Sequence, residues 1–119
     1  MSKMNWEKLT SINELEKIDE QSVQAPVVIF KHSIKCSISS TALDRIERKW
    51  NQDNHPAIRA YYLDLISYKE VSNAIAAKYG VVHQSPQILM IESGKCVYND
   101  SHFGISYDVL LDKMEQLTA

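Results

Sequence analysis

The stretch VVIFKHSIKCSISST, residues 27–41, joins an apolar run to a helix start rich in hydroxyl groups. The four apolar residues 27–30 predict a buried strand that ends in a short turn. The carboxyl edge of such a strand is where open α/β sheets place their ligand sites. Cys36 follows that edge and directly precedes Ser37, the first residue of the predicted helix. The free N–H groups and the positive dipole end of the helix favour thiolate over thiol there, which predicts a reactive nucleophile.

Apolar periodicity on both sides of this stretch predicts the remaining elements. A short extended lead-in at Trp6 precedes a helix over residues 12–20, which Ser11 and Glu14 close as a capping box. The later elements are a helix that reaches Trp50, a turn over 51–56, a strand over 57–65, a helix over 71–79 that Gly80 stops, strands over 87–91 and 95–98 joined at Ser93-Gly94, and a helix from Ser106. The predicted order is β-α-β-α-β-α-β-β-α, with the strands of the tight hairpin antiparallel.

Composition favours one domain over residues 1–119, with a single core between sheet and helices. The 13 Lys and Arg are scattered and offset by 15 Asp and Glu, for a net charge of -2, so no nucleic-acid partner is expected. No run has the length of a signal-peptide core or of a membrane span. We therefore expect a cytoplasmic protein that does not bind membranes.

The chain has two cysteines, Cys36 and Cys96, and both are expected to be free thiols in a reducing compartment. Cys96 lies in a predicted hairpin strand with no helix end behind it, so packing is its expected role; a resolving role stays open if the strand turns its sulfur toward Cys36. No Cys-x-x-Cys or His-Glu-x-x-His is present, and we expect no metal. Three scattered glycines exclude a glycine-rich phosphate loop.

Cys36 and Ser39 have Cys-x-x-Ser spacing, which places both near one end of the same helical turn. A hydroxyl at Ser39 can donate a hydrogen bond to a thiolate but cannot displace a mixed disulfide, so the resolving thiol must come from another molecule. Two plainer interpretations stay open. Cys36 would then be a small buried residue of the core, and Ser39 an ordinary hydroxyl of the first helical turn.

The predicted order, with a cysteine opening the helix after the second strand and a proline before the terminal hairpin, resembles the thioredoxin fold. This is an α/β fold with a central mixed sheet and helices on both faces. Four segments look like those of the YtxJ-like monothiol bacilliredoxins: FKHS at 30–33, CSIS at 36–39, HQSPQ at 83–87 and YNDSH at 98–102. The resemblance covers nearly the whole chain, and the four segments together are more specific than any one of them.

The resemblance implies that the protein removes bacillithiol, a low-molecular-weight thiol, from mixed disulfides on client proteins. Cys36 matches the attacking cysteine of the family and Ser85-Pro86 its cis-proline loop, where backbone next to the proline would pair with an incoming peptide or thiol. The implied partners are bacillithiolated proteins, with bacillithiol as co-substrate and no bound cofactor. The family motif is Cys-Pro-Ile-Ser, whereas this chain has Ser37, which offers the sulfur an extra N–H donor and a hydroxyl.

Four basic side chains are candidates for roles at the site. Lys35 either tunes the thiolate and attracts carboxylates of bacillithiol or is merely solvated, and for Lys31 we expect the solvated state. His32 could act as a base, but no acidic residue is evident to orient it, which favours a structural role. His102 enters the last helix, a loop that comes near the active site in this fold, where it would contact substrate.

Two other functions stay open. The first is a cysteine-based peroxidase or redox sensor, in which Cys36 meets peroxide and passes through a sulfenic acid. The second is a non-catalytic binding module that keeps the fold and uses the edge at Ser85-Pro86 to hold a partner strand.

Overall fold

A computed structural model describes residues 6–50, 55 and 57–118 of the protein, so the predicted turn at 51–56 lies almost wholly outside the described residues. The predicted order of elements is confirmed, with one added 3₁₀ turn. The elements are β1 (Trp6–Lys8), α1 (Glu14–Gln24), β2 (Val27–His32), α2 (Ser37–Lys49), β3 (Arg59–Asp64), α3 (Lys69–Tyr79), β4 (Gln87–Glu92), β5 (Lys95–Ser101), η2 (His102–Gly104) and α4 (Tyr107–Thr118).

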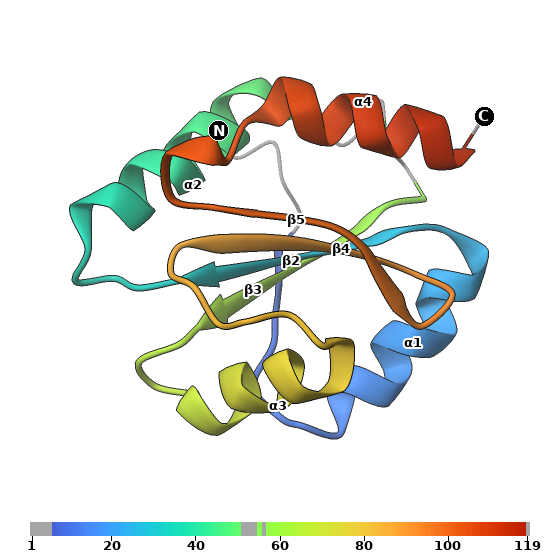
Figure 1. Cartoon of the computed structure of the whole chain (residues 1–119), viewed down its shortest axis with the longest axis horizontal. Coiled ribbons are helices and arrows are strands. Elements are labelled where there is room, and N and C mark those ends of the chain that lie inside the picture. Colours follow the sequence, from blue (N-terminus) through green and yellow to red (C-terminus); the bar gives the residue numbers. More distant parts are fainter. Residues whose placement is uncertain (1–5, 51–54, 56, 119) are drawn as a thin grey trace.

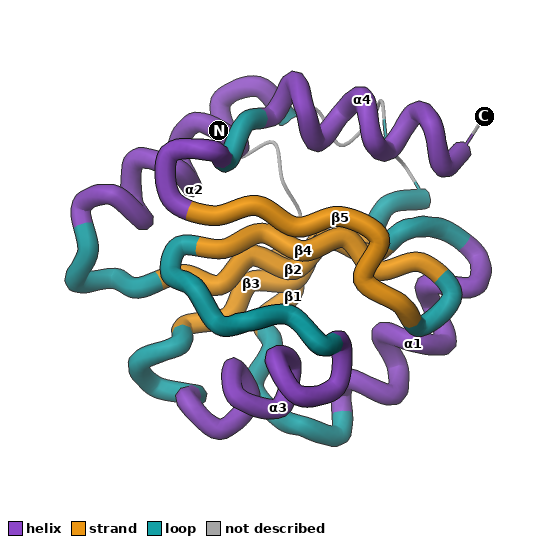
Figure 2. Tube along the Cα trace, in the orientation of Figure 1, coloured by secondary structure: helices purple, strands orange, loops and turns teal. Residues whose placement is uncertain are grey.

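The five strands form one mixed sheet in the order β1-β3-β2-β4-β5 (Figures 1 and 2). β3 runs parallel to both β1 and β2, whereas β4 runs antiparallel to β2 and to β5. The β4–β5 turn has positive φ at Ser93 (50°) and Gly94 (77°), the conformation that lets a two-residue hairpin follow the twist of its strands. The carboxyl ends of β2 and β3 therefore lie at one edge of the sheet, together with the start of β4 and the end of β5.

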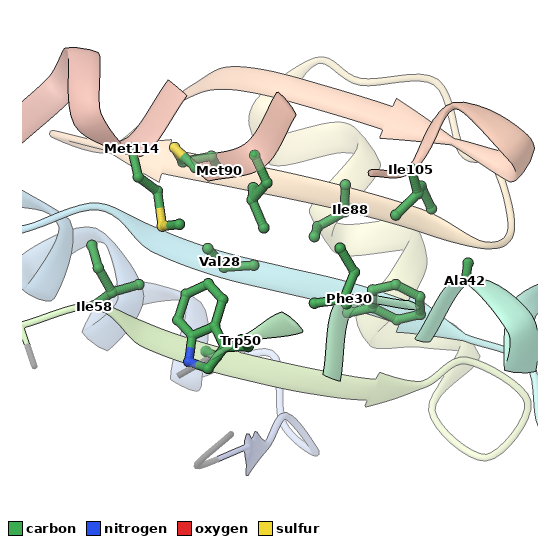
Figure 3. Packing of buried hydrophobic residues seen from close by; sticks show 12 residues of the cluster. Val28, Phe30, Ala42, Trp50, Ile58, Ile88, Met90, Ile105 and Met114 are labelled. Carbon is green, nitrogen blue, oxygen red and sulfur yellow. The ribbon is translucent and has the colours of Figure 1, made fainter. Parts of the chain in front are cut away.

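Helices cover both faces of the sheet, α2 and α4 on one and α1 and α3 on the other (Figure 2). Side chains alternate along β2, so Val28 and Phe30 face the α2/α4 layer while Val27 and Ile29 face the α1/α3 layer. Figure 3 shows the first of these two cores, in which Trp50 packs beside Val28 and Phe30. Because β2 is buried on both faces, its carboxyl end is held firmly in place.

Local signals in the sequence set the ends of several helices. Glu14 Oε1 accepts hydrogen bonds from the N–H of Ser11 at 3.1 Å and of Thr10 at 2.9 Å, which is one half of the predicted capping box. The other half is not formed, because α1 begins at Glu14 with Asn13 as its N-cap, and the N–H of Glu14 donates to the backbone carbonyl of Ser11. Gly80 ends α3 in the left-handed conformation. None of the helices in the described part of the chain has the length and apolar character that a membrane crossing requires.

Candidate active site

The candidate site lies at the edge of the sheet where β2 and β3 end. Three segments meet there, at the left of the view in Figure 1: the β2–α2 connection that carries Cys36, the chain from α3 to β4 that contains Pro86, and η2. Residues that are far apart in sequence are thus brought to one edge, because parallel strands end side by side there and the antiparallel hairpin returns to it.

Cys36 is the N-cap residue of α2, with extended backbone (φ -111°, ψ 120°). Its carbonyl accepts the N–H of Ser40 at 3.1 Å, the first hydrogen bond of the helix, and the Cys36 side chain itself forms no cap hydrogen bond. The residue is partly exposed. Cys36 is therefore not a core residue.

Ser39 ties the loop before Cys36 to the helix after it. Its side chain is fully buried, and its hydroxyl oxygen accepts the N–H of Ser33 at 3.1 Å and lies 2.6 Å from His32 Nδ1. Ser33 in turn accepts the N–H of Cys36 at 3.1 Å, which closes a tight turn. The hydroxyl of Ser39 thus bonds to His32 and Ser33, and its contact with the thiol stays a prediction.

The surroundings of His32 are those of a residue with a structural role, which is the role that the sequence favours. The ring is buried between Phe30 and Tyr62, with ring centroids 6.2 Å and 5.5 Å away. Burial lowers the pKa of His32, although the negative charges of Asp64 and Glu47 oppose that shift. Parallel pairing sets Asp64 in register with His32 on β3, but the ring contacts the Ser39 hydroxyl, and the Asp64 carboxylate accepts the N–H groups of Ile66 and Ser67.

Lys31 is buried, and the expectation of a solvated side chain was wrong. Strand β2 continues past Phe30, and the side chain of Lys31 points into the α1/α3 layer, where it is fully buried. Its Nζ donates to the carbonyl of Ser72 at 3.2 Å and lies 3.4 Å from His83 Nδ1. Burial lowers the pKa of Lys31 to about 8. Lys31 therefore does not add its charge at the Cys36 face of the loop.

The remaining basic and hydroxyl groups of the motif lie at the surface. Lys35 and Ser37 are exposed on either side of Cys36, and the carbonyl of Ser37 accepts the hydroxyl of Thr41 at 2.9 Å. No ion pair in the described chain involves Lys35. Both side chains are free to approach a ligand bound at the thiol.

The loop before β4 lies beside η2 at the same edge. The Ser85–Pro86 peptide bond is cis, as the resemblance implies, and the carbonyl of Pro86 accepts the N–H of His102 at 3.0 Å. His102 is exposed, and Ser85 Oγ is shielded from solvent without a hydrogen-bond partner in the described chain. Within that same part of the protein the backbone N–H and C=O of Ser85 form no hydrogen bond either, so both can pair with an added strand.

Cys96 lies at the other end of the sheet. It is opposite Ile91, which in turn pairs with Val27 at the start of β2, so about 17 Å of strand separates its level from the carboxyl end of β2. Its thiol donates to the carbonyl of Tyr98 at 3.3 Å, packs against the core of the α1/α3 layer, and has a pKa raised by burial. The packing role is confirmed, and the resolving role is excluded because the sulfur cannot reach Cys36.

The described residues contain no group of three or more His, Cys, Asp or Glu side chains that could hold a metal ion. His32 and Asp64 are register neighbours on β2 and β3, and they are not part of such a group. The chemistry available at this edge is that of a thiol, hydroxyls, two exposed basic side chains and free backbone groups.

Similar solved structures define the class. A protein described as an oxidoreductase with a thioredoxin fold is 31% identical, covering 88% of this chain and 89% of its own, with a TM-score of 0.75. Thioredoxins from Malassezia sympodialis (11% identical, 100% and 96% covered, TM-score 0.75) and Trypanosoma brucei brucei (17%, 98% and 93%, 0.73) share the fold alone. The protein has a thioredoxin fold, with a cysteine opening its second helix.

The family follows from a match that spans most of the chain. Residues 7–110 match the family described as Monothiol bacilliredoxin BrxC. The chain belongs to this family, and its family and fold are those of thiol–disulfide redox proteins.

Proposed function

We propose that this protein removes bacillithiol from mixed disulfides on client proteins, with Cys36 as the nucleophile. One observation carries the proposal: a partly exposed cysteine caps α2, while a buried hydroxyl, Ser39, occupies the position three residues on. A sulfur that attacks a disulfide and has no second thiol within reach suits deconjugation of a small thiol better than dithiol oxidation of proteins.

The exchange consists of one bond formed and one broken. The thiolate of Cys36 attacks the bacillithiol sulfur of the mixed disulfide, the sulfur–sulfur bond to the client breaks, and the client cysteine leaves as a thiolate that takes up a proton. Cys36 then carries bacillithiol. A second thiol, free bacillithiol or a partner reductase, attacks that disulfide and restores Cys36 as a thiolate, so no oxidant is consumed.

Surrounding groups have separate roles in this proposal. The first-turn N–H groups of α2, with Ser37 and Lys35, stabilise the negative sulfur. Backbone groups of Ser85 pair with the client or the small thiol as a short added strand. His102, exposed and fixed beside Pro86, contacts the bound substrate.

Exposed apolar side chains at the same edge fit a protein client. They come from four connections between elements and from the start of α2: Ile34, Ile38, Ile66, Val82 and Phe103, with Val82 and Phe103 exposed by 78% and 74%. Apolar side chains that gather around a reactive group are typical of a docking surface.

Incubation with a bacillithiol-modified protein, followed by intact mass analysis, tests the proposal. We expect the adduct mass to move to this protein and to map to Cys36. The unmodified form of the same client is the control, and it should leave the mass unchanged. Sulfenic acid at Cys36 after peroxide treatment, without adduct transfer, would instead support the peroxidase or sensor, and no reaction of either kind would support the binding module.

A further inference from the structure

Lys31 is a buried cation without an acidic partner. The ion pairs of the described chain do not include it, and its Nζ has two neighbours, the carbonyl of Ser72 and Nδ1 of His83. A fully buried lysine is rare unless it is paired, because burial penalises the charged form. The carbonyl and the imidazole are therefore the groups that stabilise this ammonium.

The contact with Lys31 fixes the ring of His83. An ammonium group can only donate hydrogen bonds, so Nδ1 of His83 must accept, and the hydroxyl of Ser72, 3.2 Å from the same atom, can donate to it as well. The hydrogen of the neutral imidazole then lies on Nε2. Burial and the charge of Lys31 both lower the pKa of His83, which keeps the ring neutral in this tautomer.

A pocket of about 330 Å³ lies in front of this histidine. Its polar groups are an ammonium, an amide, a hydroxyl and the imidazole, and no carboxylate lines it; the lining residues are Leu65, Ile66, Lys69, Ser72, Asn73 and His83. Lys69 is exposed and forms no ion pair within the described chain. Most of the pocket surface is apolar, but Lys69, Asn73 and His83 bring hydrogen-bond donors and one positive charge to it, and such a set suits an anionic group.

The pocket lies on the α3 side of the edge at which β2 and β3 end. Leu65 and Ile66 directly follow β3, and His83 lies three residues before Pro86, on the chain that runs to the edge where Cys36 lies (Figure 1). We propose that this pocket binds a carboxylate of the small thiol, with Lys69 and the Nε2–H of His83 as its donors and Lys31 holding the ring from behind. The inference rests on the proposed function, because it assigns the recognised group of the substrate.

Binding is tested apart from catalysis with a Cys36→Ser variant and malate, used as a small dicarboxylate probe at constant ionic strength. NMR titration should show saturable shifts at the His83 ring and at amides of residues 65–73. His83→Leu and Lys69→Gln should weaken them by about tenfold. His83→Gln, which keeps an N–H donor at the Nε2 position, should retain most of the binding, and Lys95→Gln, an exposed lysine on β5, should change nothing. Shifts that are absent, or spread over the surface, would overturn the proposal.

Exchange kinetics give the second readout. With a bacillithiol-modified peptide, Lys69→Gln should raise KM by about tenfold with kcat unchanged. With the same peptide modified by β-mercaptoethanol, which has no carboxylate, the variant should match the wild type. An equal effect on both substrates refutes the carboxylate pocket. If malate binds as described but Cys36 accepts neither adduct, the proposed function fails while the pocket stands.

Discussion

The two cysteines of this protein lie at opposite ends of one sheet and differ in their local surroundings. Cys36 caps a helix where two parallel strands end, is partly exposed, and forms a tight turn that Ser39 holds in place. Cys96 lies within β5, packs on the α1/α3 core, and has a pKa raised by burial. Both cysteines are only partly exposed. The comparison therefore shows that the two are distinguished by their positions relative to the ends of strands and helices, and not by exposure alone.

The largest expected effect is on exchange itself. Cys36→Ser should lower the rate of bacillithiol transfer by at least about 1,000-fold, since the nucleophile is lost, while Cys96→Ser should stay within about twofold of the wild type. Stopped-flow or quenched mass analysis of the adduct gives both rates. A comparable loss in Cys96→Ser would break the contrast between the two ends of the sheet.

Alkylation of the two thiols in one sample sharpens the same contrast. At pH 7 iodoacetamide should modify Cys36 about 100-fold faster than Cys96, because only the thiolate reacts and burial disfavours that form at Cys96. Peptide mapping against time measures both rates. In urea the two rates should converge, and a difference that survived unfolding would show that local sequence rather than structure produces it.

The charge of Lys31 gives a test that depends on pH, with Lys95 at the other end of the sheet as the control. The pKa of Lys31 is about 8 in the folded protein and 10.5 when exposed, so the unfolded state binds more protons between these values and the free energy of unfolding should rise with pH there. The rise due to Lys31 is about 1.5 kcal/mol from pH 8 to 9.5. Urea unfolding of Lys31→Met should lack this rise, and Lys95→Met, an exposed lysine near Cys96, should keep it.

A new thiol at the Cys36 end gives the smallest of these effects. Ser39→Cys should form an intramolecular disulfide with Cys36 under mild oxidation at least about ten times faster than Ser40→Cys, the adjacent and exposed position. Non-reducing mass analysis after alkylation of the free thiols measures the yield. If the Ser39→Cys variant stayed fully reduced, the geometry of this helix start would be wrong.

Much of the fold could be predicted because its signals are local. Apolar periodicity gave the order of elements, Gly80 the end of α3, and Ser93-Gly94 the hairpin, since each depends on residues close in sequence. Cys36 could be located for the same reason, as strand, turn and helix start are contiguous.

The expectation of a solvated Lys31 was wrong because the burial of this residue depends on pairing with strands that are distant in sequence. Lys31 and His32 look like the polar end of a strand, but β2 continues through both because β3 pairs with both residues and β4 pairs with Lys31. Asp64 lies in register with His32 only because of that pairing, and His83 reaches Lys31 from 52 residues away. One signal in the sequence could have predicted the burial of Lys31. This lysine directly follows four apolar strand residues, and a strand that is covered on both faces buries every side chain.

The wide separation of the two sulfurs also determines how the release of an adduct from Cys36 depends on the concentration of external thiol. A mixed disulfide at Cys36 has no internal route to release, because Cys96 is held at the far end of the sheet by the β4–β5 register. Its lifetime must therefore shorten in proportion to the concentration of the external thiol, with no plateau from an intramolecular step. The fraction of protein molecules that carry an adduct at steady state would accordingly track the free thiol pool around them.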